Sequence, residues 1–77
     1  MFFVYILKLN NKKYYVGYSN DLEARIKDHR SRKVNSTKNK NPHLIFYAAF
    51  STKTKALKFE KYLKSSSGFA FRNKRLI

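Results

Sequence analysis

The apolar positions at the start of the chain follow the two-residue period that is typical of β-strands. Residues 2–9 present six apolar or aromatic side chains before the first charge at Lys8. A run this short, rich in Val, Ile and aromatic residues, favours a strand over a helix. Alternate residues point to opposite faces, and here both faces are apolar. The pattern therefore predicts a central strand that is covered on both sides.

A second alternating run, residues 13–18, predicts a partner strand that forms a hairpin with the first. With a three-residue loop at 10–12, Tyr5 lies opposite Gly17, and Tyr15 falls on the same face as Tyr5. A two-residue turn over the asparagines would shift the register by one and place the two tyrosines on opposite faces. We predict the odd-length loop, in which the glycine leaves space over the first tyrosine.

The polar residues after the hairpin predict the start of a helix. Asn20 is a good N-cap, and Glu23 stands three residues later as its capping-box partner. The helix is expected to run from Asp21 to about Arg32. Leu22 and Ile26 lie on one stripe of this helix, which should face the sheet.

Two basic side chains border this apolar stripe. Arg25 follows Leu22 by three positions, and His29 follows Arg25 by four. Both also have an ordinary structural explanation, because a basic side chain often lays its stem along the core and a helix histidine is often half-buried. Asp28 is expected to pair with Arg32 at the i+4 position.

The basic stretch 30–41 predicts a long loop, because Val34 is its one apolar residue and Pro42 ends it. Loops of this length in small domains tend to be functional or disordered. Its basic content favours contact with phosphate, and a solvated surface loop is an equally weighted alternative.

The remaining pattern predicts one strand and two helices. Residues 43–50 are apolar on both faces and form the third strand. Ser51-Thr52 then caps a helix over residues 53–64. Glu60 lies on or beside the buried stripe of this helix, where it is either a partner of Lys64 or a candidate metal ligand.

Residues 65–68 are expected to break this helix, because they combine three serines with a glycine. Residues 69–76 then form a short basic helix with Phe69 and Leu76 turned inward. The predicted fold class is α+β, with a small three-stranded antiparallel sheet flanked by helices in the order β-β-α-β-α-α. The chain of 77 residues is expected to form a single domain, 1–77.

Composition narrows the possible functions. The chain has no Cys and only two His, so neither disulfides nor a Cys-rich or His-rich metal site is expected. No apolar stretch approaches membrane length, and the N-terminus does not resemble a signal peptide. We therefore expect a cytoplasmic protein.

The net charge indicates the kind of partner. Lys and Arg total 18 against 4 Asp and Glu, a net charge of +14, which favours nucleic acid as the partner over a membrane surface.

The hairpin triplets resemble those of the GIY-YIG nuclease family. Phe3-Val4-Tyr5 stands where the family has its first triplet, with Phe3 in place of the glycine, and Tyr15-Val16-Gly17 stands where it has its second. The ending over residues 62–76 is similar to that of the small stand-alone GIY-YIG proteins of bacteria. The resemblance covers essentially the whole chain.

This resemblance implies hydrolysis of a phosphodiester bond with a single divalent cation, Mg²⁺ or Mn²⁺. It implies that Tyr5 takes or relays a proton from the attacking water and that Arg25 stabilises charge on the phosphorane. Tyr15 would hydrogen-bond water or phosphate, and His29 would orient or relay. Glu60 would be the metal ligand.

Contacts with nucleic acid are expected from the basic loop and the terminal helix, namely from Lys33, Lys38, Lys40, Arg72 and Lys74. Asn73 loosely matches a late asparagine of homing-type family members. The expected substrate is DNA, cleaved with weak or structure-directed specificity in repair or recombination by a monomer or weak homodimer.

Two other interpretations stay open at this point. A non-catalytic nucleic-acid-binding module on the same fold explains the charge and the long loop equally well, but it does not explain Glu60. A ribosome-associated basic protein explains the composition alone.

Overall fold

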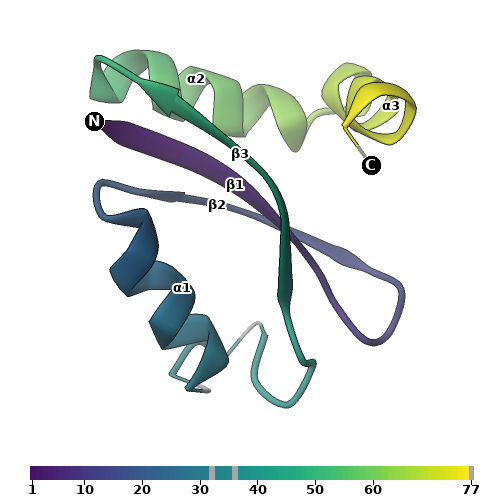
Figure 1. Cartoon of the computed structure of the whole chain (residues 1–77). Coiled ribbons are helices and arrows are strands. Elements are labelled where there is room, and N and C mark those ends of the chain that lie inside the picture. The colour runs from purple at the N-terminus through teal and green to yellow at the C-terminus, as the bar shows by residue number, and fades with distance from the viewer. Residues whose placement is uncertain (32, 36, 77) are drawn as a thin grey trace.

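The computed structural model describes residues 1–31, 33–35 and 37–76, and Figure 1 shows how they are arranged. The elements are β1 (Phe2–Lys8), β2 (Tyr14–Ser19), α1 (Leu22–Arg30), β3 (His43–Phe50), α2 (Lys53–Leu63) and α3 (Ser66–Arg75). This is the predicted order. The strands form one antiparallel sheet, β2-β1-β3, with α1 on one face and α2 on the other (Figure 1). Within the described residues, no helix is both long and apolar enough to cross a membrane.

The first strand is the centre of the molecule, as predicted, because β1 pairs with β2 along one edge and with β3 along the other. Its alternating side chains enter two separate cores. The core toward α2 consists of Val4, Ile6, Val16, Ala56 and Leu63. The core toward α1 consists of Tyr5, Leu7 and Leu9, against which Tyr15, Leu22, Ile26 and Leu44 pack.

The hairpin has the odd-length loop. The Leu9 amide donates to the Lys13 carbonyl at 2.9 Å, and Lys12 has a left-handed φ of 65°, a combination found in three-residue hairpin loops. Tyr5 therefore lies opposite Gly17. The predicted register is confirmed, and both tyrosines of the two triplets lie on the face toward α1.

The first helix is shorter than predicted at both ends. Its N-cap is Asp21, whose carboxylate accepts a hydrogen bond from the amide three residues on, at 3.1 Å. The prediction of Asn20 as the cap is therefore wrong, because the charged neighbour binds the positive end of the helix instead. The helix ends at Arg30. The predicted Asp28–Arg32 pair lies outside the described residues.

The junction of α2 and α3 is tighter than predicted. Only Lys64, the C-cap of α2, and Ser65, the N-cap of α3, separate the two helices, and the Ser65 hydroxyl accepts from the Gly68 amide at 3.2 Å. The helix therefore begins at Ser66, and the expected break over 65–68 is wrong. Leu76 packs against the core toward α2, as predicted, whereas Phe69 is 52% exposed instead of turned inward.

Gly68 lies where α3 meets the end of α2, and there is no room for a side chain. A Cβ at this position would lie 1.6 Å from the carbonyl oxygen of Tyr62, a backbone atom that cannot swing aside. We expect Gly68→Ala to lower the free energy of unfolding by about 3 kcal/mol, the upper part of the usual range for overpacking. Urea unfolding measures this change. The exposed neighbour provides the control, because Ser67→Ala should stay within about 0.5 kcal/mol of wild type; equal losses in both variants would contradict the close approach.

Candidate active site

Tyr5 projects from the middle of β1, and its ring lies across Gly17 of β2. A Cβ on Gly17 would lie 2.4 Å from both the Cζ and the hydroxyl oxygen of Tyr5. Any side chain at this position would therefore displace the phenol, which is the space that the sequence pattern predicts. The Tyr5 side chain has no solvent exposure, so its hydroxyl needs a partner inside the protein.

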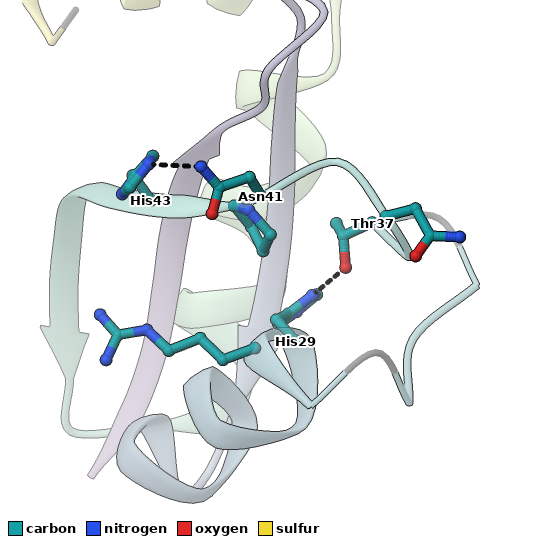
Figure 2. Close-up of a pocket in the computed structure, with 7 residues that line it drawn as sticks. His29, Thr37, Asn41 and His43 are labelled. Carbon is teal, nitrogen blue, oxygen red and sulfur yellow. Dashed lines mark hydrogen bonds between the residues drawn. The ribbon is translucent and has the colours of Figure 1, made fainter.

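That partner is His29 on α1. The Tyr5 hydroxyl and His29 Nε2 are 2.8 Å apart. On the other edge of the ring, Nδ1 lies 2.7 Å from Thr37 Oγ1, a contact drawn in Figure 2. The histidine is 1% exposed and both of its ring nitrogens are paired, so the imidazole is held in one orientation.

Tyr15 completes a cluster of three rings. Its centroid lies 5.0 Å from that of His29, edge to face, and 6.3 Å from that of Tyr5. The Tyr5 and His29 rings are also edge to face, at 5.6 Å. Such tilted contacts are favourable between aromatic rings, and they fix the positions of the two hydroxyl groups relative to the imidazole.

Arg25 faces the two phenols from the preceding turn of α1. Its interaction with the Tyr5 hydroxyl, and to a lesser extent with Tyr15, raises the pKa of the guanidinium above its already high value. A permanent cation with a planar fork of donors therefore interacts with two phenols, and such a fork also matches phosphate oxygens.

The protonation states of the buried pair follow from their surroundings. Burial raises the pKa of Tyr5 above its ordinary value, and the nearby Arg25 guanidinium opposes this rise. Burial, helped by the Arg25 charge, lowers the pKa of His29, while Asp28 opposes this change. At neutral pH the site therefore rests as a neutral phenol beside a neutral imidazole.

Glu60 lies on α2, the helix on the other face of the sheet. Its carboxylate accepts from Lys64 Nζ at 3.3 Å, which is the helix salt bridge that the sequence allows. Alongside the larger effect of burial, the Glu60 charge also raises the pKa of Tyr5, so the carboxylate lies within electrostatic range of the phenol.

This donor set fits Mg²⁺ or Mn²⁺ better than zinc. Over the described part of the chain, no three His, Cys, Asp or Glu side chains come together. An ion would be held through the single carboxylate of Glu60, with water and substrate oxygens completing its shell, an arrangement ordinary for Mg²⁺ but not for Zn²⁺.

The family of the chain follows from a comparison with known domains. A family model of the GIY-YIG catalytic domain matches residues 1–75. The chain belongs to the GIY-YIG family of nucleases. The UPF0213 protein YazA of Bacillus subtilis (strain 168) is 42% identical over 64 residues, which cover 80% of this chain and 65% of YazA. A UPF0213 protein of Staphylococcus aureus (strain Mu3 / ATCC 700698) is 38% identical over 65 residues, covering 82% of this chain and 79% of that protein.

A solved structure agrees with the GIY-YIG fold described above. The solution NMR structure of the UPF0213 protein BH0048 from Bacillus halodurans matches with a TM-score of 0.60 at 29% identity, over 99% of this chain and 87% of that chain. The α+β fold class predicted from the sequence is therefore confirmed. The names of these relatives state no activity, and the chain spans slightly less than two thirds of YazA.

The five site residues expected from the GIY-YIG resemblance divide into two groups. Tyr5, Tyr15, Arg25 and His29 converge on the face of the sheet toward α1. Glu60 comes from the helix on the other face, and among these four residues its charge affects the pKa of Tyr5. Their catalytic and metal-binding roles stay predictions.

The residues expected to contact nucleic acid are less uniform. Lys33, Lys38 and Lys74 are exposed, and Lys40 is half-buried. Arg72 is only 6% exposed, and its guanidinium lies 4.4 Å from the Phe69 ring centroid and 5.3 Å from that of Tyr14. Arg72 is therefore largely shielded from solvent by its stacking on two rings, and its contact with nucleic acid stays a prediction.

Asn73 lies away from the ring cluster. Its Oδ1 accepts from Arg72 Nε at 3.4 Å, and both residues line a cavity of about 360 Å³ near the hairpin loop, with Lys12, Lys13, Tyr14 and Phe69. The structure therefore places Asn73 beside the stacked arginine and not beside Tyr5 or His29.

Sequence reasoning missed Thr37. This residue lies in the basic loop and is 1% exposed, yet it binds the imidazole of His29. No periodic pattern marks a single threonine within a polar stretch. The same loop closes a cavity of about 460 Å³ beside the histidine (Figure 2), lined by His29, Arg30, Thr37, Asn39, Asn41, Pro42 and His43.

The lowered pKa of His29 predicts how folding depends on pH. In the unfolded chain the imidazole titrates near 6.5, whereas in the folded protein it titrates at lower pH. The stability due to neutral His29 is therefore fully present above pH 6.5 and is lost as the pH falls through the folded pKa, by at most about 1.4 kcal/mol per pH unit for one proton. NMR titration of the imidazole signals measures the pKa directly. His43→Gln assigns the signals, since His43 is the other histidine and is exposed; a His29 pKa at or above 6.5 would contradict the prediction.

Proposed function

We propose that this GIY-YIG protein is a metal-dependent endonuclease that hydrolyses phosphodiester bonds in DNA. The observation that carries the proposal is the buried 2.8 Å hydrogen bond between the Tyr5 hydroxyl and the Nε2 atom of His29. A phenol in contact with a neutral imidazole can pass a proton on without first becoming a phenolate. The net charge of +14 supports a polyanionic substrate.

The proton route explains why Tyr5 need not be ionised beforehand. Because burial raises its pKa, a resting phenolate would be rare at neutral pH. In the proposed step, the oxygen of a water molecule bonds to phosphorus while its proton passes to the Tyr5 oxygen and the Tyr5 proton passes to His29 Nε2. The bond from phosphorus to the 3′-oxygen breaks, and solvent protonates that oxygen.

Arg25 and Tyr15 are proposed to bind the phosphate. The Arg25 guanidinium interacts with the Tyr5 hydroxyl in the free chain, as their mutual effects on pKa indicate, and the phenol has no solvent exposure. We propose that the guanidinium exchanges this contact for the phosphate when DNA binds, which opens the phenol to the attacking water. Its fork then stabilises charge on the phosphorane, with the Tyr15 hydroxyl as a second donor.

Glu60 is proposed to hold the metal ion. A bound Mg²⁺ or Mn²⁺ would supply charge neutralisation at the phosphate and at the leaving oxygen. The side chain is 20% exposed, which leaves it accessible to an ion, and its partner Lys64 is an exposed residue whose pairing is weak.

A non-catalytic DNA-binding module is the second candidate. It accounts for the basic loop, in which Lys33 and Lys38 are exposed and Lys40 is half-buried, but gives no use to a buried Tyr5–His29 pair beyond packing. Cleavage directed by DNA structure, a role in repair or recombination, a cytoplasmic location and a monomeric or weakly dimeric state are also proposals. Weak sequence specificity is expected where phosphate contacts dominate, because such contacts carry no sequence information.

Removal of the Glu60 charge distinguishes a metal-dependent endonuclease from a non-catalytic DNA-binding module. We expect Glu60→Gln to lower single-turnover cleavage by about 10³-fold, since metal neutralisation of a phosphate contributes several kcal/mol. Affinity for DNA in the presence of chelator should hold or rise, because one repulsive charge is removed. The measurement uses a panel of labelled duplex, branched and single-stranded DNAs with Mg²⁺, Mn²⁺ or chelator.

The matched control is Glu23→Gln, which removes one exposed carboxylate from the first turn of α1. This variant should cleave and bind like wild type. If Glu60→Gln cleaves as well as Glu23→Gln, the glutamate is a salt-bridge residue and the metal assignment fails. Absence of metal-dependent cleavage on every DNA would favour the binding module.

The basic loop should contribute to DNA affinity through phosphate contacts. On duplex DNA, log K falls with log salt by about 0.9 per phosphate neutralised, so Lys38→Ala with Lys40→Ala should make the slope shallower by up to about 1.8. Filter binding across a range of salt concentrations measures the slope. Lys53→Ala with Lys55→Ala is the control of equal charge, because both are exposed at the start of α2; identical slopes for the two pairs would remove the loop from the interface.

A further inference from the structure

Thr37 reaches His29 from a loop that is anchored on several sides. The Thr37 amide donates to the Val34 carbonyl at 3.1 Å, and the Thr37 carbonyl accepts from the Lys40 amide at 3.1 Å. The Lys40 carbonyl in turn accepts from the Asn10 amide, at 2.7 Å, which ties the loop to the hairpin. The threonine hydroxyl is therefore held at a fixed position beside the imidazole.

The hydrogen-bond partners determine which nitrogen of the neutral imidazole carries the proton. Thr37 Oγ1 has one proton, and the Val34 carbonyl 3.5 Å away is an acceptor for it. With the proton directed there, the lone pairs of the hydroxyl face His29 Nδ1, 2.7 Å away. An oxygen that accepts requires a protonated Nδ1. This assignment leaves Nε2 bare.

The other side of the ring is compatible with the same tautomer. Arg25 is a donor without acceptor atoms, and its guanidinium interacts with the Tyr5 oxygen. The phenol proton therefore needs an acceptor, and over the described residues His29 Nε2 is the hydrogen-bond partner found for it. With the proton on Nε2, the phenol oxygen would face donors on two sides and its own proton would have no acceptor there.

We propose that Thr37 is a positioning residue that holds His29 as the Nδ1–H tautomer, so that Nε2 is the acceptor for the Tyr5 proton. The inference rests on the proposed nuclease function for its catalytic half, while the tautomer itself is a property of the folded chain. Free histidine in water prefers the opposite tautomer, with its proton on Nε2, so the protein must impose this one.

A hydroxyl in this position also tunes the basicity of the imidazole. When Nε2 takes the Tyr5 proton, Nδ1–H keeps its bond to Thr37, and no other group needs to turn. Thr37 is neutral, so it stabilises the imidazolium less than a carboxylate would, and His29 readily returns the proton.

Several charged and titratable groups face His29 and enter any pH profile. They are Tyr5 on β1, Tyr15 on β2, Arg25, Asp28 and Arg30 on α1, and His43 at the start of β3. Every variant in the test below keeps these groups unchanged, so a shift in the profile reports on Thr37.

The decisive experiment is an NMR measurement of the two imidazole nitrogens of His29 in the ¹⁵N-labelled chain. Long-range ¹H–¹⁵N correlation above the histidine pKa distinguishes a protonated from a bare nitrogen. We expect Nδ1 protonated and Nε2 bare in wild type and in Thr37→Ser, which retains the hydroxyl. Thr37→Val keeps the shape, lacks the hydroxyl, and should move toward the Nε2–H tautomer. Thr54→Val, at an exposed threonine of α2, should match wild type.

Activity supplies the second readout. Single-turnover cleavage by Thr37→Val should fall roughly 10- to 100-fold, the usual effect of removing a group that orients a site histidine, with DNA affinity unchanged. The acid limb of its pH profile should move, and Thr37→Ser should restore both rate and profile. A residue that only packs the loop would change none of these after correction for the folded fraction.

Different results would refute the tautomer assignment and the catalytic role of Thr37. A protonated Nε2 in wild type refutes the tautomer assignment without any variant, so the test survives if Thr37→Val fails to fold. An unchanged tautomer in Thr37→Val, or a changed tautomer with wild-type cleavage, refutes the positioning role. A wild type that cleaves no DNA would overturn the proposed function and the catalytic half together, while the NMR result would still decide the tautomer.

Discussion

The hydrogen bond between the Tyr5 hydroxyl and His29 Nε2 determines the rest of the site. It joins two residues that are 24 positions apart, one on the central strand and one on the helix that covers it. The bond forms because the hairpin register brings Gly17 under the phenol, where a Cβ would lie 2.4 Å from the hydroxyl oxygen. A register slip of one residue would turn the second tyrosine to the opposite face, and the ring cluster would not exist.

The burial of Tyr5 and His29 also determines their protonation states. A buried phenol resists ionisation and a buried imidazole resists protonation, so neither group alone is a strong base or acid at neutral pH. In the resting site both groups are neutral, and the hydrogen bond between them is a route by which the phenol can pass its proton to the imidazole. Arg25 lowers the pKa of the phenol and Glu60 raises it, so two charges of opposite sign act on the Tyr5 hydroxyl.

The hairpin and the site tyrosines were predictable because local rules decide them. A three-residue loop fixes the register, alternation assigns the faces, and a strand glycine opposite a tyrosine leaves space. Long-range placement was not predictable in this way. Thr37 is held by an anchored polar loop, and Arg72 is stacked between rings of β2 and α3; no sequence period signals either contact. Asn20 and Asp21 are both good caps, so composition could not choose between them.

The measurement that tests the account most directly is single-turnover cleavage by Tyr5→Phe on a DNA that wild type cleaves. This change keeps the ring over Gly17 and removes only the hydroxyl that bonds to His29. Tyr18→Phe is the control, because Tyr18 packs on the opposite face of the sheet. The account predicts a loss of at least about 10²-fold for Tyr5→Phe, the usual scale for a proton-transfer group, with DNA affinity retained. Equal cleavage by the two variants would contradict it.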